Sequence, residues 1–341
     1  MEYINGLTLK KLKNELSEEL ELKAFRGEQL FRWIHSKKIL DLVEAKNLNG
    51  NMISKIEEKY KLDLIEKVEM LKSKEDNTKK YLFRLDDGNI IEAVYMEYKH
   101  GNSLCISSQA GCRMDCKFCA SAKNGLARNL RASEMIEQIY SIERDLDTTI
   151  DSIVVMGTGE PFDNFDNLMD FLDIITDEKG KNLSKRKITI STCGIVSKIY
   201  ELADKEEPYN LAISLHSAFQ RYREEMIPIA KQNKIEDIVS ACDYYLKKTN
   251  RRITYEYILI EGYNDRIEDK LELVKLLKEQ NCLVNIISLN PIKEFDGKSP
   301  NSKKMNDFKN FLKRKGVNAT VRRKLGRDID GACGQLRRKF K

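Results

Sequence analysis

Long apolar runs are absent from this 341-residue sequence, and their absence excludes two classes of protein. The N-terminal stretch MEYINGLTLKKLKNELSEEL lacks the apolar segment of a signal peptide, and no later run approaches the length of a membrane-spanning helix. Hydrophobic residues make up 41% of the chain and charged residues 33%, a balance that excludes a disordered chain. We therefore expect a globular cytoplasmic protein with no membrane partner.

Acidic residues are scarce at the C-terminal end of the chain. Residues 301–341 carry 14 Lys and Arg against three acids, a net charge of +11, which leaves −5 for the first 300 residues. Such a segment suits either a solvated tail or a surface that binds phosphates, and charge alone gives affinity without specificity. Binding of a phosphate-rich partner can therefore be inferred only if a second observation supports it.

Cysteine is present eight times, at positions 105, 112, 116, 119, 193, 242, 282 and 333. Thiols stay reduced in the cytoplasm, so these residues indicate metal or redox chemistry more than a disulfide framework. Their spacing is uneven, since four of them fall between Cys105 and Cys119.

The periodicity of apolar residues divides the chain into a helical part and an α/β part. Residues 1–65 predict three short helices, and in the second, Phe25, Leu30, Phe31 and Ile34 share one face. That helix suits either an ordinary amphipathic helix or one that faces RNA. The segments KKYLFRL and NIIEAVYMEY, joined by DDG, predict a β-hairpin.

After the hairpin, strand and helix signals alternate. Six core strands in βα order begin at SLCISS and end at CLVNIISL, and NATVRR follows as a trailing strand. This order predicts an α/β fold, a partial (β/α)6 barrel with a small N-terminal helical accessory domain. In such a barrel the chemistry lies in the loops at the carboxyl ends of the strands.

The first of these loops, AGCRMDCKFCAS, holds Cys112, Cys116 and Cys119 in a C-x3-C-x2-C arrangement. Structural zinc takes four ligands, so Cys105 or His100 would have to complete a zinc site. The alternative is a four-iron, four-sulfur (4Fe–4S) cluster that leaves one iron open for a small molecule.

This loop, with Phe118 beside the last cysteine, resembles the signature of the radical S-adenosylmethionine (AdoMet) superfamily. The resemblance implies that AdoMet binds the open iron and that an electron from the cluster breaks its sulfonium. It also implies an AdoMet-binding role for Gly159 and Glu160 in GTGEP. Further candidate AdoMet contacts at strand ends are Ser191, Ser214, Leu215, His216 and Asn290.

The segments CISSQAGCRMDCKFCA, VVMGTGEPFDN, AISLHS and DIDGACGQLRR together resemble the RlmN/Cfr family of radical AdoMet methyltransferases. The resemblance implies methylation of an adenine in 23S ribosomal RNA. In RlmN the methyl group goes to carbon 2, and certain transfer RNAs are also substrates; in Cfr it goes to carbon 8. The proline of GEP, Pro161, favours RlmN, whereas Ser217 in SLHSAF favours Cfr.

Carried onto this chain, the resemblance makes Cys333 the methyl carrier and Cys105 the thiol that releases the product through a transient disulfide. It makes Glu92 the base that accepts the adenine proton, although by itself Glu92 suits a solvent-facing strand carboxylate. It also implies a protein electron donor such as flavodoxin or ferredoxin. Cys193, Cys242 and Cys282 match no role and are expected to be small core residues.

The predicted organisation has four parts. They are a helical RNA-binding accessory domain at 1–65, a β-hairpin connecting segment at 66–97, the radical AdoMet barrel at 98–328, and a catalytic-cysteine segment with a basic tail at 329–341. Two alternatives to the carbon-2 enzyme stay open: a carbon-8 methyltransferase, and a non-catalytic RNA-binding protein stabilised by zinc.

Overall fold

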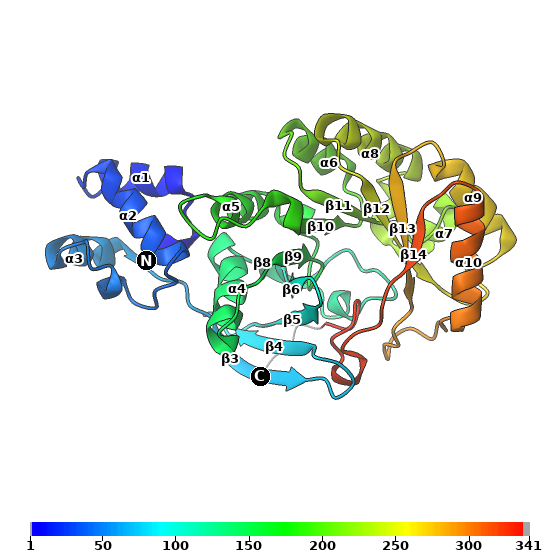
Figure 1. Ribbon diagram of the computed structural model, residues 1–341, viewed down its shortest axis with the longest axis horizontal. Helices are drawn as coiled ribbons and strands as arrows, with labels where there is room; N and C mark the ends of the chain where they lie inside the picture. The colour runs from blue at the N-terminus through cyan, green and yellow to red at the C-terminus, as the bar shows by residue number, and fades with distance from the viewer. Residues whose placement is uncertain (1, 337–341) are drawn as a thin grey trace.

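The computed structural model describes residues 2–336, so the last basic residues of the predicted tail, 337–341, lie outside it. The N-terminal part contains the three predicted helices, α1 (Leu9–Glu18), α2 (Ala24–His35) and α3 (Gly50–Lys59), at one end of the molecule (Figure 1). Side-chain oxygens of Thr8 and Asn49 accept hydrogen bonds from backbone N–H groups in the first turns of α1 and α3, which explains where these helices begin.

The second helix differs in one respect from its predicted face. Leu30, Phe31 and Ile34 are buried, whereas Phe25 is 49% exposed, with the guanidinium of Arg26 lying 4.8 Å from its ring centre. Two short strands, β1 (Glu2–Tyr3) and β2 (Tyr60–Lys61), pair in parallel beside these helices.

A single ten-stranded sheet forms the rest of the fold, in the order β14-β13-β12-β11-β10-β9-β6-β5-β4-β3. Its antiparallel end consists of β3 (Glu66–Lys72), β4 (Lys79–Arg84) and β5 (Ile90–Tyr98), which pairs with β6. The seven parallel strands are β6 (Gly101–Ile106), β9 (Ser152–Val155), β10 (Ile188–Thr192), β11 (Asn210–Ser214), β12 (Ile253–Leu259), β13 (Cys282–Ser288) and β14 (Ala319–Val321). A separate pair, β7 (Gln109–Gly111) and β8 (Leu126–Asn129), flanks the cysteine loop.

Six of the parallel strands are neighbours in sequence order, and the partial (β/α)6 barrel is therefore confirmed, with β14 as the trailing strand. The predicted hairpin is also present as β4 and β5, but β3 extends it to three strands.

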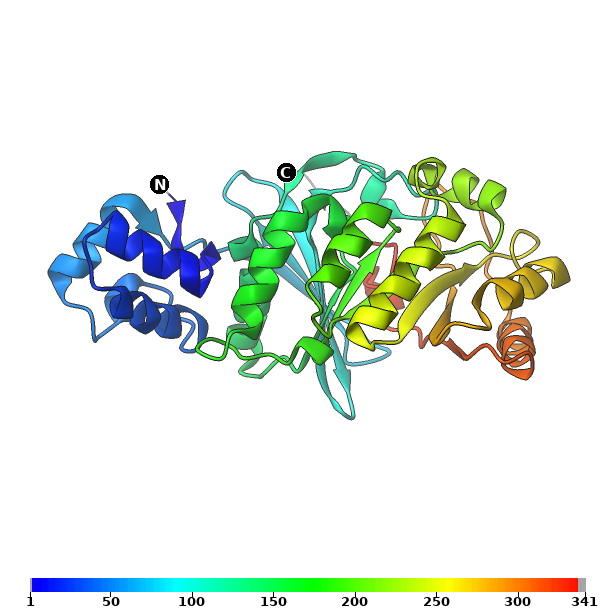
Figure 2. The same cartoon turned by 90° about the horizontal axis from the view of Figure 1, so that it is seen from above.

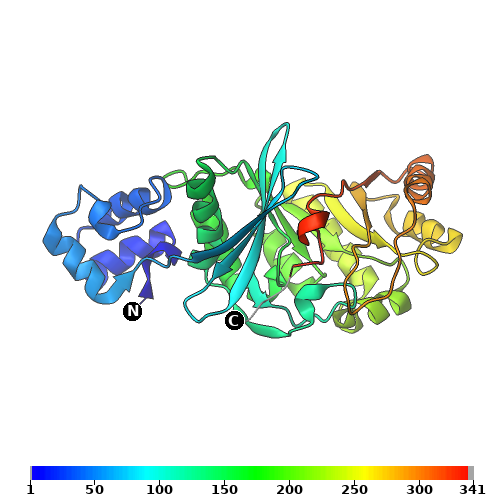
Figure 3. The same cartoon turned by 90° about the horizontal axis from the view of Figure 1, so that it is seen from below.

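Within residues 2–336, seven α-helices follow the N-terminal three: α4 (Ala132–Leu146), α5 (Phe165–Thr176), α6 (Val196–Asp204), α7 (Gln220–Met226), α8 (Ile235–Thr249), α9 (Ile267–Leu277) and α10 (Ser302–Arg314). Figure 2 shows helices along one face of the sheet, and Figure 3, from the other side, shows the C-terminal segment beside β3–β5. Of these seven, α4, α7 and α8 were not anticipated from the sequence. None of the helices described is long and apolar enough to cross a membrane.

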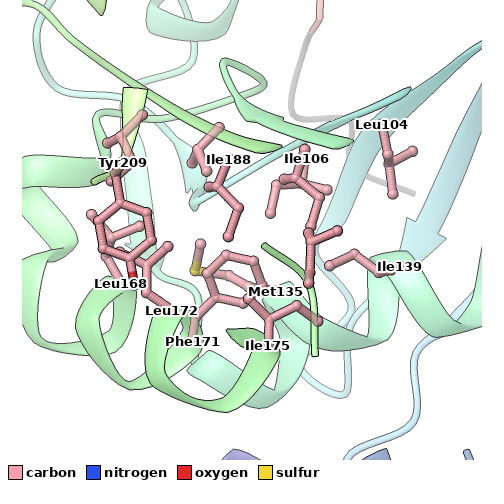
Figure 4. Close-up of a cluster of buried hydrophobic side chains, with 14 of the residues drawn as sticks. Leu104, Ile106, Met135, Ile139, Leu168, Phe171, Leu172, Ile175, Ile188 and Tyr209 are labelled. Atoms are coloured by element: carbon pink, nitrogen blue, oxygen red, sulfur yellow. The ribbon is translucent and has the colours of Figure 1, made fainter. Parts of the chain in front are cut away.

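The main core extends along the helices that cover the sheet, and the part of it between the sheet and helices α4 and α5 is shown in Figure 4. Leu104 and Ile106 of β6 and Ile188 of β10 point toward Met135 and Ile139 of α4 and toward the apolar face of α5. Phe171, on α5, is completely buried in this cluster. This close-packed layer holds β6 and β10 in position. Such a layer relaxes only partly when a side chain is removed from it.

Replacing Phe171 with Ala is expected to lower the free energy of unfolding by about 3–5 kcal/mol, because it leaves a cavity beneath the sheet. Chemical denaturation monitored by circular dichroism measures the loss. Leu271→Ala, at a side chain that is 50% exposed on α9, is the control and is expected to stay within about 0.5 kcal/mol of the parent. Equal losses in both variants would show that the layer in Figure 4 is not the main core.

Candidate active site

Two adjoining pockets open at the carboxyl ends of the parallel strands. The first, here called the cluster pocket, is lined by Cys112, Cys116, Cys119, Glu160, Ser191, Ser214, His216 and Glu256, among others. The second, here called the thiol pocket, is lined by Val94, Met96, Tyr98, Cys105, Asn290 and Cys333, among others. Cys333 and Arg322 line both pockets, so the two cavities meet at these side chains.

The three-cysteine loop is held between β7 and the barrel. The backbone N–H of Cys112 donates to the Gly125 carbonyl at 3.1 Å, and that of Cys119 donates to the Cys116 carbonyl at 3.1 Å. Phe118 packs edge-on against His216, with 4.7 Å between ring centres. These contacts turn all three thiols toward the cluster pocket.

The three thiols fit a cubane cluster better than a single ion. In residues 2–336, no three His, Cys, Asp or Glu side chains stand close enough to ligate one metal ion. A 4Fe–4S cluster bonds each thiolate to a different iron, so its ligands surround a volume and not a point. Cys105 lies in the thiol pocket, and His100 stacks on Tyr98, so neither completes a zinc site with the three thiols.

Burial raises the pKa of the Cys112 thiol to about 12, and it raises the pKa of Cys116 well above its ordinary value. Thiolates are the form that binds metal, and a bound cluster compensates the charge that burial disfavours. Cys112, Cys116 and Cys119 are therefore the residues that would hold the cluster.

The GTGEP turn follows β9 and packs directly on the end of β6. A Cβ atom on Gly157 would lie 2.6 Å from the Ile106 carbonyl oxygen, and Gly159 has a φ of +111° with no room for a side chain beside Gln109. These glycines let the turn approach the neighbouring strand and place Glu160 in the cluster pocket. The Glu160 carboxylate accepts hydrogen bonds from the backbone N–H groups of Cys193 at 2.7 Å and Phe162 at 3.0 Å.

Glu160 can bind an ammonium group. Its carboxylate is 4% exposed, and burial raises its pKa, whereas the hydrogen bond from Cys193 N–H opposes that rise. Together with the hydroxyls of Ser191 and Ser214, it gives the cluster pocket an acid and two neutral polar groups. That set suits the amino acid portion of AdoMet.

His216 stands in the left-handed region, with a φ of +57°. Its Nδ1 accepts a hydrogen bond from the Ile258 N–H at 3.0 Å, which assigns the proton of the neutral ring to Nε2. Burial lowers the pKa of His216 to about 3, and Arg223 adds to that effect, so the ring is neutral. Leu215, by contrast, is buried in the main core and does not line the cluster pocket.

Cys105 and Cys333 come together in the thiol pocket, although 227 positions separate them in the sequence. Cys105 lies on β6, and Cys333 follows the short helix Arg327–Ile329 in the C-terminal segment. The Cys333 side chain is exposed and lines both pockets. All eight cysteines are reduced, so the predicted disulfide is not a structural bond.

The backbone around Cys333 is anchored on both sides. Asn290 Nδ2 donates to the Cys333 carbonyl at 3.0 Å, so Asn290 holds this segment and does not line the cluster pocket. The N–H of Ala120 donates to the Gly334 carbonyl at 2.8 Å, and Ser121 Oγ donates to the Leu336 carbonyl at 2.7 Å. The cysteine loop and the Cys333 segment therefore support each other.

Glu92 is completely buried on β5, so a solvent-facing carboxylate is the wrong interpretation. Side chains alternate between the faces of a strand, which places Glu92 on the same face as Val94 and Met96, two residues that line the thiol pocket. Its carboxylate lies 3.5 Å from the ammonium of Lys80 on β4.

Three site residues were not anticipated from the sequence. Arg322 follows β14, and its guanidinium lies 3.8 Å from the buried carboxylate of Glu256, which accepts hydrogen bonds from Asn285. Cys193 is buried, as expected, but it lines the cluster pocket together with Cys333 and the three thiols of the cysteine loop. For these three residues, the only signal in the sequence was the position of Arg322 at the end of a strand. A charged side chain inside a protein is recognised from the partners it contacts, and the sequence does not show those partners.

The positive charge of Arg322 acts on both Cys105 and Cys333. Burial raises the pKa of Cys105 to about 12, and its protein surroundings also raise the pKa of Cys333; the positive charge of Arg322 opposes both rises. Its position between the pockets therefore favours the thiolate form of either cysteine.

Comparison with known proteins agrees with this geometry. The family model of the radical SAM superfamily matches residues 106–277, and that of the ribosomal RNA large subunit methyltransferase N-terminal domain matches residues 4–62. The chain is therefore a radical SAM enzyme, a class that uses a 4Fe–4S cluster and AdoMet.

Relatives that match over nearly the whole chain show which kind of radical SAM enzyme this is. A probable dual-specificity RNA methyltransferase RlmN from Lachnospira eligens is 49% identical over 93% of this chain and 91% of its own length. Another so named, from Clostridium perfringens, is 48% identical over 100% of this chain and 98% of its own. The crystal structure of a radical SAM methyltransferase from Sphaerobacter thermophilus superposes with a TM-score of 0.93 at 35% identity, covering 98% of this chain and 99% of that one.

The chain belongs to the RlmN family of radical SAM RNA methyltransferases. Membership in this family sets aside the non-catalytic zinc-binding alternative.

Proposed function

We propose that this enzyme methylates carbon 2 of an adenine in 23S ribosomal RNA and in transfer RNA, with Cys333 as the methyl carrier. The observation that supports the proposal is the placement of Cys105 and Cys333 in one pocket that adjoins the pocket of the three cluster thiols. The relatives named RlmN, at 47–49% identity, support carbon 2 over carbon 8.

Carbon 2 of adenine lies between two ring nitrogens and is electron-poor, so it does not attack a methyl donor as an amine would. When bound, the cluster and AdoMet supply the methyl group and a hydrogen-abstracting radical. Cys333 carries the methyl group as a thioether, and hydrogen abstraction turns that group into a carbon radical that adds to the adenine.

The remaining steps use Glu92 and Cys105. Radical addition leaves one unpaired electron on the adduct, and this electron passes to an oxidised electron-carrier protein as Glu92 accepts the proton that leaves carbon 2. The Cys105 thiolate then attacks the Cys333 sulfur, which breaks the bond between that sulfur and the transferred carbon, and that carbon takes up a proton to become the methyl group. Cys105 and Cys333 are then joined as a disulfide, which an external dithiol reduces before the next turnover. The electron that starts the radical step comes from a reduced protein such as flavodoxin or ferredoxin.

Binding of an RNA substrate explains the positive charge of the C-terminal segment. Arg323 and Lys324 line the thiol pocket beside Arg322, where they would meet the phosphates that flank an adenine drawn from its stack. We assign residues 1–65 to RNA binding, supported by the exposed Phe25 and its neighbour Arg26 on α2. We place the barrel at 98–328, the connecting segment at 66–97 and the catalytic-cysteine segment at 329–341, all in a cytoplasmic enzyme.

Carbon 8 is the second candidate, favoured in the sequence by Ser217. In the structure Ser217 is completely buried, and its hydroxyl exchanges hydrogen bonds with the backbone of Phe219 at 3.1 Å. It shapes the turn after β11 and is not among the residues that line either pocket, so its position adds no support for carbon 8.

Mass spectrometry of 23S and transfer RNA from cells with and without the gene tests the proposal. We expect 2-methyladenosine only where the gene is present. Appearance of 8-methyladenosine instead would establish the second candidate, and unchanged RNA would contradict both.

A further inference from the structure

Lys80 is a buried lysine that no step described above uses. Its side chain is 4% exposed, and its ammonium lies 3.5 Å from Glu92 Oε1 and 3.3 Å from the backbone carbonyl of Asp330. Desolvating an ammonium costs free energy unless ionic and hydrogen-bonding partners replace water. Here the two partners are the proposed base and the segment that carries Cys333.

The register of the sheet puts these groups on one face. Lys80 pairs with Val94 across β4 and β5, and Val94 pairs with Cys105 across β5 and β6. Residues directly opposite each other point to the same side of a sheet. Lys80 and Glu92 therefore lie on the same face of the sheet as Val94 and Cys105, which line the thiol pocket.

The Cys333 segment lies against the turn that joins β3 to β4, just before Lys80 (Figure 3). Ser73 Oγ and the Lys74 N–H donate to the Asp328 carboxylate at 2.7 Å, and the Gly326 N–H donates to Asp76 at 3.1 Å. Lys80 adds the contact to Asp330, three residues before Cys333. It is thus a side chain that contacts both the proposed base and the Cys333 segment.

We propose that Lys80 is a positioning residue for the transfer of the methyl group to RNA. Its ammonium fixes the position of the Glu92 carboxylate and, through the Asp330 carbonyl, sets the distance between Glu92 and the carbon carried on Cys333. This inference rests on the proposed function. Lys80 acts only after Cys333 has been methylated, because Glu92 has no part in loading that thiol.

The test separates the two halves of the reaction. Reconstituted enzyme is incubated with AdoMet, reductant and a 23S ribosomal RNA fragment; peptide mass spectrometry then measures methyl-Cys333, and nucleoside mass spectrometry measures methyladenosine. Lys80→Gln is expected to keep methyl-Cys333 within about threefold of the parent and to lose about a hundredfold in methyladenosine, the scale of a misplaced catalytic group. Because proton removal stalls, a covalent protein–RNA adduct should accumulate on a denaturing gel.

Lys79 provides the matched control, since it is the adjacent lysine on the opposite face of β4 and lies 4.7 Å from the ring centre of Tyr95. Lys79→Gln is expected to resemble the parent in all three measurements. Lys80→Arg keeps the positive charge and should recover at least about tenfold of the loss. Equal loss of methyl-Cys333 and methyladenosine in Lys80→Gln would mean a merely structural role and overturn the inference, as would parental rates of both.

A double variant keeps the test decisive if Lys80→Gln does not fold. Lys80→Gln with Glu92→Gln removes both buried charges together, and it should match Glu92→Gln alone in methyladenosine if Lys80 acts through Glu92. A further tenfold loss in the double variant would overturn the inference. Absence of both methyl-Cys333 and methyladenosine in the parent enzyme would instead contradict the proposed function, so the two failures are distinguishable.

Discussion

Replacing Cys333 with Ala is expected to abolish RNA methylation, by at least about 10³-fold, while the protein keeps its fold and its cluster. The side chain is exposed in the cavity, so its removal deletes no core packing. The contacts that hold this segment, from Asn290 and Ala120, reach backbone carbonyls that the variant retains. Only the sulfur that would carry the methyl group is lost.

Nucleoside mass spectrometry of RNA treated with the purified variant measures this loss, and iron analysis of the same sample checks the cluster. Cys242→Ala is a suitable control, because Cys242 is a completely buried thiol of the main core and is expected to be dispensable for methylation. Methylation by Cys333→Ala at the parental rate would remove Cys333 from the mechanism.

The strands of the barrel could be predicted from their local composition. Segments such as ITIST and CLVNIIS are short, rich in β-branched residues and bounded by polar turns, which is typical of strands. Among the strands of the ten-stranded sheet, the one that was missed is β3, which has the sequence EKVEMLK at the edge of the sheet and buries none of its side chains. With little apolar surface to bury, its conformation depends on pairing with β4, which no local pattern reveals.

Helix α4 was missed for the opposite reason. Eleven of its fifteen residues are buried, yet five of these are polar: Ser133, Glu134, Glu137, Gln138 and Glu143. Glu134 is paired with Arg128 and Arg131, and Gln138 hydrogen-bonds the backbone of Ser107. Polar side chains whose burial depends on distant partners obscure the apolar stripe by which a helix is recognised.

The residues of the candidate site also divide into those that local sequence patterns predict and those whose role depends on distant partners. The cysteine loop and the GTGEP turn are local motifs, and their residues lie together as the resemblance implied. The importance of Lys80, Arg322 and Glu256 could not be predicted, because each depends on a partner that the fold brings near. Lys80 is paired with Glu92, and Arg322 is paired with Glu256. Asn290 shows the converse, since its strand-end position suggested a cofactor contact while its amide holds the Cys333 carbonyl.

Replacing Cys116 with Ala is expected to remove the cluster, lowering the iron content from about four atoms per chain to near zero after reconstitution. Two thiolates cannot hold a cubane that already leaves one iron without a protein ligand, and the loop offers no substitute at that position. AdoMet cleavage and RNA methylation should fall below detection together, because the electron that begins the reaction has no other route. Iron and sulfide analysis and the visible absorption of the brown protein measure the effect.

Cys193 provides the control for this prediction, because it is another buried thiol that lines the same pocket. Its backbone N–H binds Glu160, and its carbonyl accepts from Arg223, two contacts that Cys193→Ser preserves. We expect Cys193→Ser to retain about four irons per chain and to cleave AdoMet. Loss of iron in Cys193→Ser and its retention in Cys116→Ala would show that the ligand set is not the C-x3-C-x2-C triad.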